Sequence, residues 1–169
     1  MTGAAAGPRF LPLGDSGLVV EFGGDEISDA ANGAVLALRA TLEAERLPGI
    51  RETVPTYRSL LVVYDPACVG ASELRALVTA LLGQAGRVSL PAGRRIEIPT
   101  VYGGVHGPDL AGVAEETGLS ESQVVAVHAG TEYRVYMTGF SPGFPYMGTL
   151  PPALRVPRLR SPRTRVPVR

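Results

Sequence analysis

Eight residues, from Gly139 to Tyr146, restrict the backbone more than any other part of this sequence. They read Gly-Phe-Ser-Pro-Gly-Phe-Pro-Tyr, with two glycines and two prolines. Each proline fixes φ and removes a backbone donor, so the segment cannot form a helix or a central strand. The residues just before it, 133–137, alternate and are rich in aromatic and β-branched side chains, which predicts a half-buried strand. We therefore expect a strand that leads into an ordered loop.

The loop has the composition of a small-molecule site. Its three rings would form an apolar wall, a serine and a tyrosine hydroxyl would supply polar contacts, and its glycines would let a ligand approach the backbone. Ordered loops held by a scaffold often carry function. The alternative is that the rings pack under the loop and close the end of a barrel. The predicted binding residues of the loop are Gly139, Phe140, Ser141, Pro142, Gly143, Phe144 and Tyr146.

Charge and composition exclude several classes of function. The 169-residue chain has a formal net charge of zero and a pI near 6.7, which argues against nucleic-acid or anionic-membrane binding through bulk charge. The chain has no lysine, so its permanently cationic side chains are all arginines. An arginine can bind a carboxylate through two parallel hydrogen bonds. One cysteine, Cys68, and two histidines without HExxH spacing predict no metal site. No signal peptide or transmembrane run is recognisable, so we expect a cytoplasmic protein.

Hydrophobic periodicity predicts an α+β first half. Two pairs of strands each precede a helix, which favours helices on one face of an antiparallel sheet. The apolar run 60–63 predicts a strand buried on both faces. The turn Tyr57-Arg58-Ser59 is either solvated or turned toward a partner. The expected elements are strands 9–13, 18–22, 50–56 and 60–64, a helix capped by Asp25 and ended by Pro48-Gly49, and a helix capped by Ser72.

The second half begins after a glycine-rich loop, residues 83–93, which is the predicted domain boundary. We therefore expect domains at residues 1–85 and 93–169. Alternation over 94–101 predicts a strand. Two helices should follow, one from Pro108 to Gly118 and one, capped by Ser120, that ends at His128.

His128 and the arginines of the tail are the candidates for chemistry. A histidine at a helix C-terminus favours its protonated form, but it can equally pack against Tyr133 or cap carbonyls. Arg158 and Arg163, with Arg165, could hold a substrate carboxylate through paired hydrogen bonds. Alternatively, these arginines form surface ion pairs with Glu115, Glu116 or Glu132, which contribute little.

Together these residues resemble the family of KipI and the B-type subunit of 5-oxoprolinase, also called allophanate hydrolase subunit 1, which is similar to the carboxyltransferase part of urea carboxylase. The resemblance rests on the loop motif GF-x-PGF-x-Y and the tail motif PR-x-x-SPR-x-x-VP, and it covers nearly the whole chain. The matching residues and segments are, in sequence order, 55–62, 64–66, 99–104, 107–110, His128, Tyr133, Val135, 139–140, 142–144, Tyr146, 157–158 and 161–167.

The resemblance implies a fold and a function. It implies a small antiparallel α/β sandwich domain followed by a cyclophilin-like β-barrel domain. Members act as one subunit of an ATP-dependent amide hydrolase that opens 5-oxoproline to glutamate, with a KipA-type and a LamB/YcsF-type subunit. ATP would then be bound with partner subunits, because a chain without lysine has no GxxxxGK[ST] loop. The implied site is His128 as catalytic residue, with Tyr133, the loop, Arg158 and Arg163 binding substrate.

Two departures from the family pattern matter. Val105-His106 follows Gly103-Gly104 where an acidic residue is usual, and the sequence ends at Val168-Arg169, just after Val166-Pro167, where the family continues. We therefore expect an incomplete barrel and a non-autonomous subunit of a hydrolase acting on carbon–nitrogen bonds, not an independent enzyme. The alternatives are an allophanate hydrolase subunit, an inhibitor that binds a sensor histidine kinase, and an inactive remnant. Homo-oligomerisation stays open.

Overall fold

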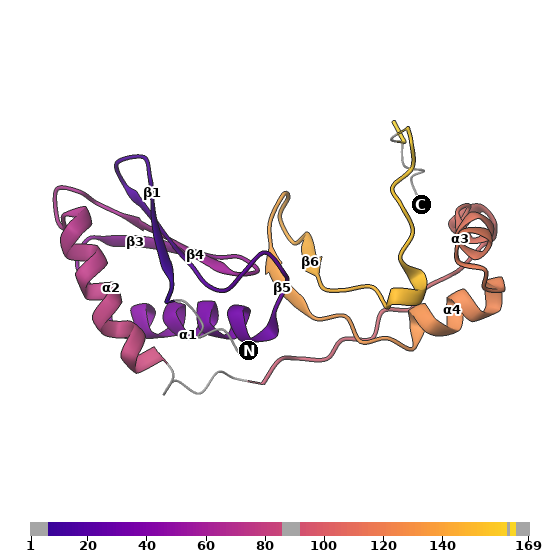
Figure 1. Ribbon diagram of the computed structural model, residues 1–169, viewed down its shortest axis with the longest axis horizontal. Helices are drawn as coiled ribbons and strands as arrows, with labels where there is room; N and C mark the ends of the chain where they lie inside the picture. Colours follow the sequence, from indigo (N-terminus) through magenta and orange to yellow (C-terminus); the bar gives the residue numbers. More distant parts are fainter. Residues whose placement is uncertain (1–6, 86–91, 162, 165–169) are drawn as a thin grey trace, which may run out of the picture. The chain divides into compact units, whose positions relative to one another are not determined.

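The computed structural model describes residues 7–85, 92–161, 163 and 164, and the chain divides into two units. The first unit comprises residues 1–93 and 135–146, and the second comprises 94–134 and 147–169. Residues 135–146 thus belong to the first unit, although the segments before and after them in the sequence belong to the second (Figure 1). The predicted domains, 1–85 and 93–169, remain a prediction. The signature residues Pro162 and Arg165 to Pro167 lie outside the described part of the chain.

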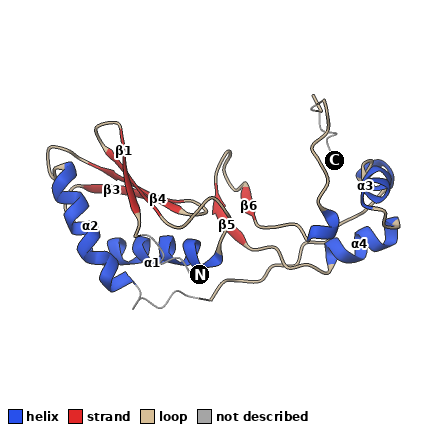
Figure 2. Ribbon diagram, in the orientation of Figure 1, coloured by secondary structure: helices blue, strands red, loops and turns tan. Residues whose placement is uncertain are grey.

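The first unit contains a four-stranded antiparallel sheet, drawn in red in Figure 2. Its strands lie in the order β1-β2-β4-β3. The register joins β1 to β2 and β3 to β4 as hairpins, and β2 to β4 at the middle of the sheet. The α+β class and the antiparallel pairing predicted from periodicity are therefore confirmed. The strands are β1 (Arg9–Leu13), β2 (Gly17–Glu21), β3 (Ile50–Pro55) and β4 (Ser59–Tyr64).

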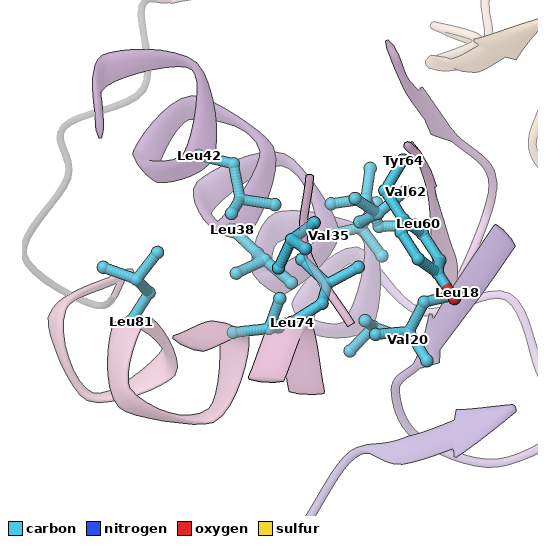
Figure 3. Close-up of a cluster of buried hydrophobic side chains, with 12 residues drawn as sticks. Leu18, Val20, Val35, Leu38, Leu42, Leu60, Val62, Tyr64, Leu74 and Leu81 are labelled. Carbon is cyan, nitrogen blue, oxygen red and sulfur yellow. The ribbon is translucent and has the colours of Figure 1, made fainter. Parts of the chain in front are cut away.

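Two helices, α1 (Asp29–Glu45) and α2 (Ala71–Ala85), contribute apolar side chains to the same core as the sheet. Val35 and Leu38 of α1 and Leu74 of α2 are completely buried (Figure 3). Burial of this kind stabilises a fold by about 1.5–3 kcal/mol for each large apolar side chain. The buried core comprises Leu18, Val20, Val35, Leu38, Leu42, Leu60, Val62, Tyr64, Val69, Leu74, Val78 and Leu81.

Strand β4 is buried on one face only, so the prediction of a strand buried on both faces was wrong. Leu60, Val62 and Tyr64 are buried, whereas Leu61 and Val63 are half-buried. The reason is that the helices contribute their core to one face. On the other face, Leu61 lies beside its cross-strand neighbours, Val19 and Val54, which cover it in part.

Both predicted N-caps of the first half were also wrong. Helix α1 begins four residues after Asp25, at Asp29, because the Ser28 hydroxyl accepts a hydrogen bond from the Ala31 N–H (3.4 Å). Asp25 instead lies 3.3 Å from the Arg58 guanidinium. Ser72 lies inside α2, which begins at Ala71. Before α1, both Asp25 and Ser28 are short polar residues suited to an N-cap, and the hydrogen bond to Ala31 identifies Ser28 as the cap.

The segment 139–146 forms the turn of a hairpin between β5 (Val135–Thr138) and β6 (Pro145–Met147). The predicted strand 133–137 is thus shifted by about two residues at its start. Pro145 and Tyr146 belong to β6, a strand of a two-stranded sheet, so the segment forms neither a helix nor a central strand, as the sequence predicts. Proline is tolerated there because it is the first residue of the strand.

The second unit is built on α3 (Leu110–Thr117) and α4 (Glu121–Ala129), with 3-10 turns η1 (Gly104–His106) and η2 (Pro152–Leu154). Its small core joins Ala114, Val124 and Leu154. The predicted helix end at Gly118 is confirmed, as is the Ser120 cap, which forms a capping box with Gln123.

The prediction of a strand over 94–101 was wrong for the structure described. The segment has no regular secondary structure, and Ile96, Ile98 and Val101 are exposed by 62%, 77% and 67%. Alternation predicts a strand only where another strand can pair with it, and no described residue does so. The described residues consequently form an open antiparallel arrangement and no closed barrel.

Candidate functional site

Five aromatic side chains of the first unit form a connected row, which we call the aromatic cluster. It joins the turn between β3 and β4 to the β5–β6 hairpin. The Tyr57 ring lies 5.3 Å from the Tyr136 ring and 6.3 Å, edge-on, from the Tyr146 ring. Phe144 lies 5.3 Å from Tyr146, and Phe140 lies 5.7 Å from Phe144. These tilted and edge-to-face distances are those of favourable aromatic pairs.

The hairpin is also tied to the first unit by a hydrogen bond. The Tyr136 hydroxyl donates to a carboxylate oxygen of Asp29, the first residue of α1, at 2.6 Å. A carboxylate at a helix N-terminus is stabilised by the helix dipole, so Asp29 is well placed to accept. The loop that the sequence singles out therefore has a scaffold.

The turn that carries Tyr57 is itself fixed by several hydrogen bonds. The Asn32 side chain, completely buried on α1, donates from Nδ2 to the Thr56 carbonyl (3.1 Å), and its Oδ1 has no partner among the described residues. Thr56 and Ser59 bond to each other across the turn (2.8 Å). Arg58 donates to the Gly24 carbonyl (2.5 Å) and pairs with Glu21 (2.8 Å). Tyr57 is thus presented to the hairpin by an ordered backbone.

Backbone strain marks the tip of the loop. Phe140 has a φ of 61°, in the left-handed region that bulky residues seldom adopt. A hydrogen bond from the Ser141 N–H to the Gly139 carbonyl (2.7 Å) closes a three-residue turn around it. The Phe140 side chain is 90% exposed, so this ring does not pack beneath the loop. Strained residues cluster at ligand clamps and active sites, which supports a functional interpretation of this tip.

A second group of rings lies in the second unit, around His128. The His128 Nδ1 lies 2.7 Å from the Tyr102 hydroxyl oxygen. The Tyr133 ring lies 5.3 Å from the imidazole, and its hydroxyl donates to the His128 carbonyl (3.3 Å). His128 does pack against Tyr133, as one of the two sequence interpretations held, and it also gains a polar partner in Tyr102.

Arg163 binds a carboxylate of its own chain. Its guanidinium donates to both oxygens of Asp109, at 3.0 and 2.5 Å, in the bidentate geometry that arginine favours. The hydrogen bond from Arg163 holds the pKa of Asp109 below its ordinary value of 3.8. Arg163 thus pairs with Asp109 and not with one of the glutamates considered for the tail arginines, and Glu132 pairs with Arg95 (2.8 Å). Arg165 lies outside the described residues. Arg158 is exposed.

We predict that Arg163→Gln raises the pKa of Asp109. The ion pair adds folding stability at pH values above the ordinary carboxyl pKa. This contribution is lost as the pH falls through the lowered pKa that Asp109 has in the folded state. A pH titration of the Asp109 carboxyl carbon by NMR, in wild type and variant, measures the difference. Asp65 is the internal control, because its pKa is lowered by a different partner, Arg51, and should not change. An unchanged Asp109 titration would show that the pair does not form in solution.

The predicted site residues are divided between the two units. The loop residues Gly139 to Tyr146 belong to the first, and His128, Tyr133, Arg158 and Arg163 belong to the second. The sequence alone did not assign Tyr57 or Tyr102 to a site. The signal for Tyr57 was an aromatic residue in an otherwise polar turn, and for Tyr102 its place before two glycines. Both contacts join residues far apart in the sequence.

Neither a metal site nor a membrane span is found within the described ranges. Their His, Cys, Asp and Glu side chains form no group of three or more that could hold a metal ion. None of the helices described is sufficiently long and apolar to span a bilayer.

Comparison with known proteins places the chain in a family. Residues 8–168 match the family described as carboxyltransferase domain, subdomain C and D. The chain is 37% identical over 165 residues to the B-type subunit of 5-oxoprolinase from Bacillus subtilis (strain 168), covering 92% of this chain and 68% of the relative. It is 42% identical over 122 residues to the corresponding subunit from Escherichia coli O157:H7, covering 72% of this chain and 55% of the relative. The chain thus spans between about half and two thirds of these relatives.

Solved structures share the fold of this chain. The crystal structure of TTHA0988 superposes with a TM-score of 0.74 at 40% identity, over 89% of this chain and 29% of the other. The urea amidolyase of K. lactis, at 14% identity, shares the fold with a TM-score of 0.58 over 82% of this chain and 10% of the other. With a family match over residues 8–168, the chain belongs to the carboxyltransferase domain, subdomain C and D, family.

Proposed function

We propose that this chain is a B-type subunit of an ATP-dependent amide hydrolase that opens 5-oxoproline to glutamate. The observation that carries the proposal is the 37% identity to a B-type subunit of 5-oxoprolinase over 165 residues, which include the whole of the candidate loop. A protein named as a subunit implies further chains. We assign these to the KipA and LamB/YcsF types, and we assign ATP binding to the assembly, since this chain has no lysine for a phosphate-binding loop.

The aromatic cluster is the proposed binding surface for the substrate. 5-Oxoproline is a five-membered lactam whose ring carbons are apolar and whose amide and carboxylate are polar. Phe144 and Phe140, 45% and 90% exposed, offer ring faces to the apolar part. Ser141 and the Tyr146 hydroxyl are the side-chain groups of the loop able to bond the polar part. The strain at Phe140 fits a residue held in place for a ligand.

Reconstitution tests the proposal. The chain is purified from its own cells with the proteins it retains, which are identified by mass spectrometry, and 5-oxoproline-dependent ATP hydrolysis is measured with and without it. We expect hydrolysis to require this chain. Allophanate as the accepted amide instead of 5-oxoproline would select the allophanate hydrolase alternative, and equal hydrolysis with and without the chain would overturn the proposal.

A loop variant tests the binding surface separately. Phe144→Ala removes an exposed ring from the cluster without touching the buried core, so turnover should fall while the fold persists. Leu77→Ala is the matched control, because Leu77 is a similarly exposed apolar residue (37%) on α2 of the same unit. Equal turnover in the two variants would exclude the aromatic cluster as the substrate surface.

A further inference from the structure

The contact between Tyr102 and His128 favours one tautomer of the neutral imidazole. A neutral imidazole has one N–H donor and one bare nitrogen acceptor. The 2.7 Å separation of the Tyr102 hydroxyl oxygen and Nδ1 requires a proton between them. A phenol is a stronger donor than a neutral imidazole N–H, and a bare imidazole nitrogen is a stronger acceptor than a phenol oxygen. The favoured arrangement is therefore Tyr102 O–H donating to a bare Nδ1.

The remaining nitrogen, Nε2, then carries the hydrogen. No described residue accepts a hydrogen bond from it. Two ring contacts restrict the orientation of the imidazole: the Tyr102 ring is edge-on to it, with an interplanar angle of 78°, and the Tyr133 ring is tilted by 38°. His128 is half-buried, so Nε2–H is a donor held in a defined direction by two tyrosines.

We propose that Tyr102 is a positioning residue that holds neutral His128 as the Nε2–H tautomer, so that His128 donates a hydrogen bond to a carbonyl or carboxylate oxygen of a ligand. This assigns His128 a donor role, not that of a base that removes a proton at Nε2. The ligand class rests on the proposed function, because 5-oxoproline carries both kinds of oxygen. The tautomer itself does not depend on that function.

Nitrogen NMR of the histidine side chains tests the tautomer directly. The full chain is labelled with ¹⁵N-histidine and studied near pH 8.5, about two units above the ordinary imidazole pKa. The chain has only two histidines, and His128→Gln identifies the signal of His128. We expect Nδ1 to resonate as a bare nitrogen and Nε2 as a protonated one.

Two tyrosine variants separate positioning from packing. Tyr102→Phe keeps the ring and removes the donor, so the Nδ1 resonance should move to the position of a bare nitrogen without a hydrogen bond. Tyr133→Phe is the matched control. It keeps the other ring and removes a hydroxyl that bonds the His128 carbonyl and not the imidazole, so the imidazole resonances should stay. Circular dichroism checks that both variants fold.

A protonated Nδ1 in the wild type would overturn the proposal, as would identical His128 spectra in wild type and Tyr102→Phe. Activity is a separate readout. If the reconstituted assembly shows no turnover of 5-oxoproline while the spectrum shows Nε2–H, the proposed function fails and the tautomer stands. If turnover occurs, Tyr102→Phe should lower kcat by on the order of tenfold through loss of orientation.

Discussion

Leu60→Ala is expected to lower the free energy of unfolding of the first unit by about 3 kcal/mol. Leu60 lies on the central strand β4 with no exposed surface and is packed in the same core as Val35, Leu38 and Leu74. Alanine would remove the transfer free energy of the lost carbons and leave a cavity that the surrounding helices and strands fill only in part. Urea denaturation followed by far-UV circular dichroism measures the change.

The neighbouring residue provides the control. Leu61 lies on the same strand but points to the face that the helices do not cover, and it is half-buried. Leu61→Ala removes the same atoms from a partly hydrated site, so we expect a loss of about 1 kcal/mol. Equal losses for the two variants would mean that both faces of β4 are covered in solution, contrary to the fold described above.

Tyr57→Ala is expected to lower kcat/KM for 5-oxoproline-dependent ATP hydrolysis about a hundredfold in the reconstituted assembly. Tyr57 is the member of the aromatic cluster that comes from the turn between β3 and β4, and it supports both Tyr136 and Tyr146. Without its ring, the hairpin keeps the Tyr136–Asp29 hydrogen bond but loses the surface on which its two tyrosines rest. The loop would then sample many positions, and few of them would suit a substrate.

Tyr57→Phe is the matched variant, because it retains the ring that makes these contacts. We expect it to keep most of the activity. Aromatic proton NMR of Phe140 and Phe144 provides a reading independent of catalysis, since both rings should shift in Tyr57→Ala and remain nearly unchanged in Tyr57→Phe. If alanine left turnover and both ring signals unaltered, Tyr57 would have no part in ordering the loop.

The candidate loop was found from the sequence because its signal is local. Proline and glycine act on their own backbone, so the segment 139–146 indicates an ordered turn without reference to any partner. The same holds for the Ser120 cap and the helix end at Gly118, which depend on neighbours within a few residues. The Asp25 cap failed because Ser28, three residues later, is an equally suitable cap, and the Ser72 cap failed because α2 begins one residue earlier, at Ala71.

The scaffold of the loop was not found, because its contacts are not local. Tyr57 meets Tyr136 and Tyr146 from a distant part of the sequence, and Tyr102 meets His128 across a helical hairpin. Side-chain type predicts that a ring will pack somewhere, but it does not predict which ring it will meet. The Arg163–Asp109 pair was missed for the same reason, since several acidic residues were equally plausible partners.

By itself, the sequence determined most secondary-structure types, the α+β class, the ordered loop and the family, because periodicity, backbone restriction and motif identity are properties of neighbouring residues. Tertiary structure alone decided which face of β4 is covered, that 94–101 is not a strand among the described residues, and that Tyr57 and Tyr102 join the candidate sites. Each of these depends on which distant segment packs against a given one. Burial and strand pairing each require two segments in contact, and a local sequence pattern describes only one of the two.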